Sequence, residues 1–123
     1  MADVLSRIHS AVVLADGDAP DFPEAALGIA AFFRERGIPM TLKAVHRKGW
    51  ILAGRDEELF ISLLPWEGWH LSYRVRKSRA VLKAGRSQLK GNLFDLVVSA
   101  PDGASPSQME IFSRMVQIMQ QIV

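Results

Sequence analysis

The apolar residues of this chain change their spacing near Met40, and this change limits the folds that the chain can adopt. Before Met40 they recur every three or four residues, which is typical of an amphipathic helix. After Met40 they alternate with polar residues, which is typical of strands with one buried face. The helical spacing returns after the turn at residues 101–103. We therefore expect helices at both ends of the chain and a sheet in the middle.

Two helices are expected before Met40. The first covers residues 3–14 and is separated from the second by the acidic turn at residues 16–21. The second begins at Asp21, which can cap free backbone N–H groups while Glu24 reaches back to it. It is expected to end at Gly37, because glycine adopts the left-handed conformation that often follows a helix.

The C-terminal segment has the strongest helical pattern. Ser105 is the expected N-cap, with Pro106 in the first turn and Gln108 completing a capping box, and the helix is expected to continue to the last residue. Its apolar side includes Met115 and Met119, and methionine is frequent at adaptable contact surfaces. We therefore expect that this helix can form the interface of a homodimer.

The middle of the chain contains five stretches that are expected to be strands. They cover residues 40–46, 50–54, 58–64, 69–76 and 93–99. The connections between the early strands are short and contain no crossover helix, which favours antiparallel pairing. In the stretch 69–76, alternation places Trp69 and Tyr73 on the core face and Arg74 and Arg76 on the solvent face. Residues 93–99 are continuously apolar apart from one aspartate, which favours a central position.

These elements predict an α+β fold in two layers. We expect an antiparallel meander of about five or six strands, with the N-terminal helices and the C-terminal helix packed on one face. The 123 residues are expected to form a single domain over residues 1–123. Hydrophobic residues make up 49% of the chain and charged residues 23%, so we expect order almost throughout.

Residues 74–90 carry seven basic side chains and no acidic one, while the segments on both sides contain more acidic than basic residues. A block of one sign attracts anionic partners. We therefore expect this block to bind an anionic partner, with nucleic acid first and an acidic protein surface second. The candidate residues are Arg74, Arg76, Lys77, Arg79, Lys83, Arg86 and Lys90.

Two geometries are open for residues 78–90. A helix would align four of the basic residues in one stripe, whereas a strand, turn and strand around Gly85 would extend the exposed face of the strand 69–76. We favour the second, because Gly85 and Ser87 weaken a helix. A solvated polar face without a partner is the simpler alternative.

Exposed aromatic rings beside the cations would favour single-stranded nucleic acid, because bases stack on such rings. The expected alternation places Trp69 and Tyr73 in the core, and leaves only Trp66 and Phe60 as candidates for exposure. The compact aromatic and glycine motifs of RNA-binding sheets are absent from the sequence. The aromatic residues therefore give little support to this hypothesis.

The sequence contains few residues that could carry catalysis. It has no cysteine, no glycine-rich phosphate loop and no serine elbow motif. The three histidines, His9, His46 and His70, are far apart in sequence, although His46 and His70 could meet across a sheet. The acidic turn at residues 16–21 does not have the ligand spacing of a calcium loop. We expect no metal and no cofactor, and we do not favour an enzyme.

The leading hypothesis is a small non-enzymatic binding protein that engages nucleic acid through residues 74–90. The alternative is a protein-interaction or chaperone-like adaptor that works as a homodimer through Met115, Met119 and the apolar turn at Trp66. The apolar stretches are too short to cross a bilayer, and the N-terminus lacks the features of a signal peptide, so we expect a cytoplasmic protein.

Overall fold

The computed structural model describes residues 3–46, 56–66, 69–87, 91–99 and 106–122. In this part of the chain, five strands form one sheet in the order β2-β1-β3-β4-β5, and all neighbouring strands are parallel. The strands are β1 (Ala11–Asp16), β2 (Met40–Val45), β3 (Leu59–Ser62), β4 (Leu82–Gly85) and β5 (Leu96–Val97). The helices are the 3-10 turn η1 (Val4–Arg7), α1 (Phe22–Glu35), α2 (Trp69–Lys77) and α3 (Gln108–Met119).

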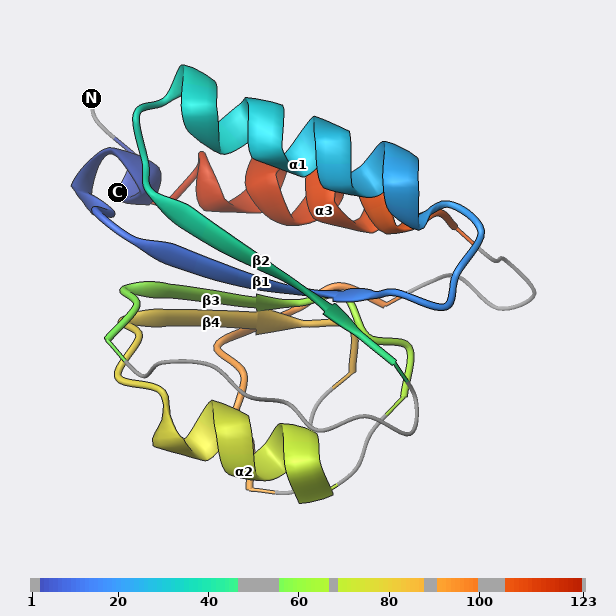
Figure 1. Cartoon of the computed structure of the whole chain (residues 1–123). Helices are drawn as coiled ribbons and strands as arrows, with labels where there is room; N and C mark the ends of the chain where they lie inside the picture. The colour runs from blue at the N-terminus through green and yellow to red at the C-terminus, as the bar shows by residue number, and fades with distance from the viewer. Residues whose placement is uncertain (1–2, 47–55, 67–68, 88–90, 100–105, 123) are drawn as a thin grey trace.

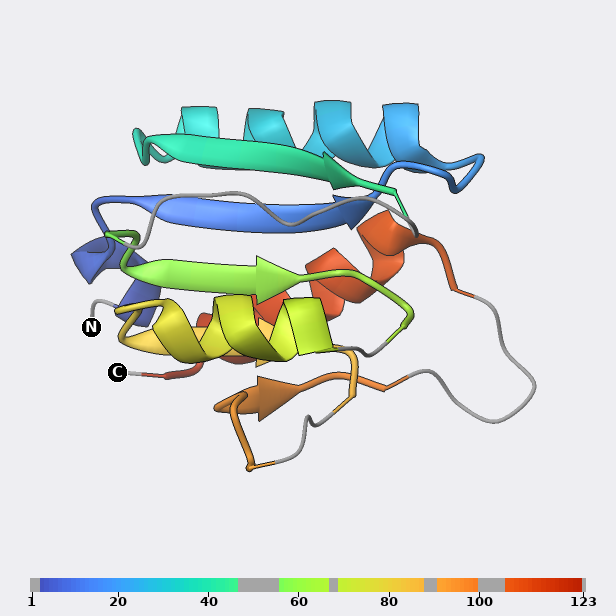
Figure 2. The same ribbon diagram turned by 60° about the horizontal axis from the view of Figure 1, so that its bottom comes forward.

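The helices cover both faces of the sheet (Figures 1 and 2). α1 and α3 lie side by side on one face, and α2 lies on the other. Each face has its own hydrophobic core. The core under α1 and α3 includes Phe33 and Phe112, and the core under α2 includes Phe60 and Leu71. The molecule therefore has three layers, with the sheet in the middle.

β1 lies between β2 and β3 and is buried on both faces. Ala11 and Val13 belong to the core under α1 and α3, whereas Val12 and Leu14 belong to the core under α2. A strand buried on both faces needs no polar positions, so its sequence is a continuous apolar run in which apolar and polar residues do not alternate. The prediction of a helix over residues 3–14 is therefore wrong, because only η1 is helical there.

The predicted antiparallel meander is also wrong. β1 pairs in parallel with β2 from Ala11 opposite Met40, and with β3 from Ala11 opposite Leu59. The chain therefore leaves β2 at one edge of the sheet and enters β3 on the other side of β1. Residues 46–58 join the two strands, and a connection of this length is long enough for a parallel crossover. The strand predicted at residues 50–54 lies outside the described residues.

Residues 69–76 form most of α2 and not the predicted strand. α2 packs on the face opposite α1 and α3, so the expectation that all helices share one face is wrong as well. Leu71 and Val75 are four residues apart, which places them on the same side of a helix, and they are only 3% and 0% exposed. An alternating pattern over so few residues is therefore compatible with both a strand and a short helix.

The other predicted elements are found with shifted bounds. α1 confirms the helix expected after Asp21, and Gly37 has the expected positive φ of 68°. α3 begins at Gln108 and ends at Met119, before the last residue. Its N-cap is Ser107, so the prediction of Ser105 as the N-cap, with Pro106 in the first turn and Gln108 completing a capping box, is wrong. The strands expected at residues 40–46 and 58–64 are β2 and β3, but residues 93–99 supply only the short edge strand β5.

Candidate nucleic-acid interface

The seven basic residues of the predicted binding block do not form one surface. Three are exposed, two are half-buried, one is buried, and Lys90 lies outside the described residues. The block is divided among α2, the loop after it, β4 and the turn after β4, and its members differ in burial. Each basic residue therefore has to be considered with its own contacts.

Arg74 is the buried member of the block. It lies on the side of α2 that faces the sheet and pairs with Glu57, with Nη2 3.0 Å from Oε1 and Nη1 3.2 Å from Oε2. Its guanidinium carbon lies 5.0 Å from the centroid of the Phe60 ring. Arg74 is only 4% exposed, so it contacts the core of its own chain and cannot reach an outside partner. The prediction that Arg74 lies on the solvent face is therefore wrong.

Glu57 is ionised in this environment although it is buried. Burial raises the pKa of the carboxyl group, but hydrogen bonds from Arg74 and Ser78 and the positive charge of Arg74 lower it by more. The pKa of Glu57 therefore lies below its ordinary value. The charge of Arg74 is thus neutralised inside the molecule at neutral pH.

Lys83 and Arg86 are half-buried and also contact their own chain. Lys83 Nζ donates to the carbonyl of Val75 at 2.9 Å, so it caps the last turn of α2. Arg86 Nη1 donates to the carbonyl of Leu63 at 3.4 Å, directly after β3. Residues 82–85 form β4, so the helical alternative for this part of the block is wrong. The chain does not turn back in a hairpin at Gly85, because β5 runs parallel to β4.

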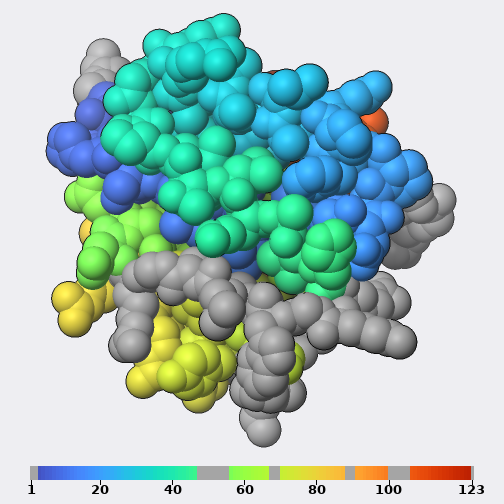
Figure 3. Space-filling model, viewed as in Figure 1, coloured from blue at the N-terminus to red at the C-terminus, as the bar shows by residue number. Residues whose placement is uncertain are grey.

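The remaining cations, Arg76, Lys77 and Arg79, are exposed at and just after the C-terminal end of α2. Tyr73 is exposed beside them, and Lys77 Nζ lies 5.5 Å from the centroid of its ring. These four residues are called the basic face of α2 below. Figure 3 shows α2 at the surface, on the side of the molecule away from α1. The helix contains no acidic residue, and the helix dipole favours cations in its last turn.

Tyr73 is the functional candidate that the sequence analysis missed. A strand over residues 69–76 would place Tyr73 in the core, opposite Arg74 and Arg76. In a helix the residues three and four positions later lie on the same side, so Tyr73 groups with Arg76 and Lys77. The signal was present in the sequence, but it is visible only when residues 69–77 are treated as a helix.

Of the residues predicted for a partner interface, the two methionines are not on the surface. Met115 and Met119 are both 0% exposed and belong to the core under α1 and α3. Trp66 is half-buried and packs against the core under α2. Phe60, the other ring expected to be exposed, is 0% exposed. Met115 and Met119 are therefore core residues in this structure, and the homodimer stays a prediction.

The histidines do not assemble into one site. His46 follows β2, and its Nδ1 lies 2.7 Å from Asp18 Oδ1 in the loop after β1. His9 Nδ1 lies 3.1 Å from Glu58 Oε1, and His70 is in α2. The possible meeting of His46 and His70 across a sheet is not found. In the described residues, no three histidine, aspartate or glutamate side chains are grouped so that they could hold a metal ion.

Open parallel sheets bind ligands at the carboxyl ends of their strands. Here Gln108 links the carboxyl end of β1 to α3. Its Oε1 accepts from the N–H of Asp16 at 2.6 Å, and its Nε2 donates to the Asp16 carbonyl at 3.2 Å. The Asp21 carboxylate accepts from the Gln108 backbone at 2.6 Å and from Nε2 at 3.2 Å. Asp21 therefore fixes α3 to the β1–α1 loop, and its side chain does not cap α1 as predicted.

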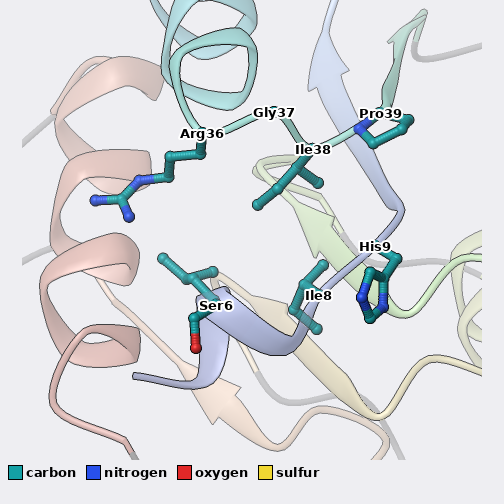
Figure 4. A pocket seen from close by; sticks show the side chains of 8 residues that line it. Ser6, Ile8, His9, Arg36, Gly37, Ile38 and Pro39 are labelled. Atoms are coloured by element: carbon teal, nitrogen blue, oxygen red, sulfur yellow. The ribbon is translucent and has the colours of Figure 1, made fainter. Parts of the chain in front are cut away.

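A cleft of about 670 Å³ opens between η1 and the turn that joins α1 to β2 (Figure 4). Arg36 and His9 lie on opposite sides of it, with Ile38 between them. Both polar side chains contact other groups of the chain: the Arg36 guanidinium carbon lies 4.7 Å from the centroid of the Phe32 ring, and His9 contacts Glu58. Among the described residues that line the cleft, Arg36 is the one arginine or lysine, whereas the basic face of α2 presents three such cations.

Comparison with known proteins does not assign a function. No family model, no curated protein and no solved structure matches this chain. In the described residues, no helix is both long enough and apolar enough to cross a membrane. Any functional conclusion therefore depends on the chemistry of the surface itself.

Proposed function

We propose that this protein binds nucleic acid through the basic face of α2. The proposal is supported chiefly by the exposure of Arg76, Lys77 and Arg79 together at the end of one helix that has no acidic residue. Cations grouped in this way neutralise backbone phosphates and release the counterions that are condensed on them. Such binding needs no catalytic group and no cofactor. A cytoplasmic location stays a prediction from the sequence.

The number of exposed cations sets the expected strength of the salt dependence. Three phosphate contacts correspond to a slope of log K against log salt of about −2 for a single strand and about −3 for a duplex. Between about 50 and 200 mM salt, the affinity should therefore fall roughly 20- to 40-fold. A protein that used all seven basic residues would show a much steeper loss.

Charge reversal tests the proposal. The triple variant Arg76→Glu, Lys77→Glu, Arg79→Glu should lose binding to a fluorescent oligonucleotide, measured by fluorescence anisotropy at low salt. Reversed charges also oppose the dipole at the end of α2, so circular dichroism should confirm the fold. The triple variant Arg76→Gln, Lys77→Gln, Arg79→Gln removes the three charges without reversing them and should also bind weakly. If either variant is folded and binds as tightly as the unchanged protein, the proposal is wrong.

A matched control separates a local effect from a change in net charge. Arg7, Arg34 and Arg114 are exposed on η1, α1 and α3. The triple variant Arg7→Glu, Arg34→Glu, Arg114→Glu changes the net charge by the same amount, but leaves the basic face of α2 intact. It should keep most of the affinity. An equal loss in this control would show that binding depends on overall charge and not on α2.

A further inference from the structure

Tyr73 is the single tyrosine of the chain, and it lies in the middle of α2. Its side chain is 57% exposed, whereas Phe33, Phe60 and Phe112 are no more than 1% exposed. Large aromatic rings contribute most to stability when they are buried. The exposure of this ring beside three cations indicates a surface suited to a partner that is both aromatic and anionic.

The positions of the side chains on α2 allow both kinds of contact at once. Tyr73, Arg76 and Lys77 are neighbours on one side of the helix, because they are separated by three and four positions. Lys77 Nζ lies 5.5 Å from the centroid of the Tyr73 ring. A base that stacks on the ring would therefore have its backbone phosphates within reach of the flanking cations. Bases stack on aromatic rings in this way in many single-strand binding proteins.

The helix that carries Tyr73 is fixed on the sheet from its opposite side. Leu71 and Val75 are almost fully buried in the core under α2. Arg74, the next residue after Tyr73, forms the buried ion pair with Glu57. The ring is therefore presented by a rigid element, and binding does not have to order the backbone that carries it.

We infer that the ligand is single-stranded nucleic acid, with an unpaired base stacked on Tyr73 and its neighbouring phosphates on Arg76, Lys77 and Arg79. This inference rests on the proposed function and makes it more specific. In a duplex, each base is already stacked between its neighbours, so the ring would reach only the backbone. The same cations would then act alone, and the aromatic side chain would contribute nothing.

The first test compares ring variants on two probes, an oligothymidine strand and a mixed-sequence duplex of equal length. Tyr73→Leu keeps an apolar side chain but removes the ring, and it should weaken single-strand binding by about fivefold or more. The salt dependence should not change, because no charge is removed. Tyr73→Phe should retain the affinity. Val81→Ala is the control for a general apolar contact, because Val81 is 71% exposed just before β4.

The second test observes the ring directly. Because the chain has one tyrosine, selective labelling of tyrosine gives a single set of ring resonances in NMR spectra. These ring protons should shift upfield when oligothymidine is added and should stay unchanged with the duplex. If Tyr73→Leu binds the single strand unchanged, or if both probes shift the ring equally, the inference is overturned. The proposed function fails separately, when charge reversal on α2 has no effect.

Discussion

Arg74 fixes α2 to the sheet through two buried charges. Burying a charged pair costs hydration energy, which is recovered only with close geometry and full hydrogen bonding. Here the guanidinium group makes two contacts with the carboxylate, at 3.0 and 3.2 Å, and the hydroxyl of Ser78 donates to the same carboxylate. Removing the carboxylate alone would leave the arginine charged and buried, which is the more costly state.

We predict that Glu57→Gln lowers the free energy of unfolding by about 3 kcal/mol at neutral pH, because Arg74 loses its counter-charge. The contribution of the pair depends on pH. The pKa of Glu57 in the folded protein lies below the ordinary 4.5, so its stabilisation is fully present above about pH 4.5 and is lost as the pH falls through the folded pKa. Urea unfolding should show a difference between the two proteins at pH 7 that narrows as the pH is lowered. A constant difference would contradict this prediction.

The helices α1 and α2 differ in how much of their structure could be predicted from local sequence. In α1 the apolar spacing, the acidic start and Gly37 at the end all indicate a helix, and they agree with the structure. In α2 the apolar positions fit both the two-residue period of a strand and the 3.6-residue period of a helix. The packing of Leu71 and Val75 on the sheet decides for the helix. No local signal shows which strands pair, so the parallel order could not be predicted from the turns.

The candidate site shows the same limit. Its charge could be predicted, because the cations are adjacent in the sequence. Which of these cations are exposed could not be predicted, because this depends on which side of α2 faces the sheet. In the structure Arg74 is buried and Tyr73 is exposed, whereas the predicted strand would expose Arg74 and bury Tyr73. Long-range contacts such as the one between Asp21 and Gln108 leave no local pattern at all.

Gln108 connects α3 to the loop after β1, and we predict that its side chain is needed to hold that loop. Gln108→Ala removes the acceptor for the Asp16 N–H and the donor for its carbonyl, and should cost about 2 kcal/mol of stability. Hydrogen exchange at the Asp16 amide should become faster. Gln117→Ala is the matched control, because Gln117 lies exposed on the same helix. Unchanged exchange at Asp16 in the Gln108 variant would contradict the prediction.

An acidic segment and the basic face of α2 lie in different parts of the molecule. Asp16 ends β1, and Asp18 and Asp21 follow it in the loop before α1, whereas the charged residues at the C-terminal end of α2 are all cations. α2 lies on the face of the sheet opposite α1. A polyanion approaching the molecule would be repelled by the acidic loop and attracted to α2. This distribution would orient the ligand before it makes any short-range contact.

Which residues of α3 can face a partner also depends on the whole fold. Met115 is fully buried between α3 and the rest of the molecule, whereas Ile118 on the same helix is 39% exposed. We predict that Met115→Lys unfolds the protein, because a buried ammonium group costs about 4 kcal/mol or more and small domains have little stability to lose. Ile118→Lys should keep the melting temperature within a few degrees. Circular dichroism and size-exclusion chromatography with light scattering measure both effects.

If α3 forms a homodimer through its outer side, Ile118→Lys gives a folded monomer. A folded monomer from Met115→Lys would instead show that this methionine lies at an interface and not in the core.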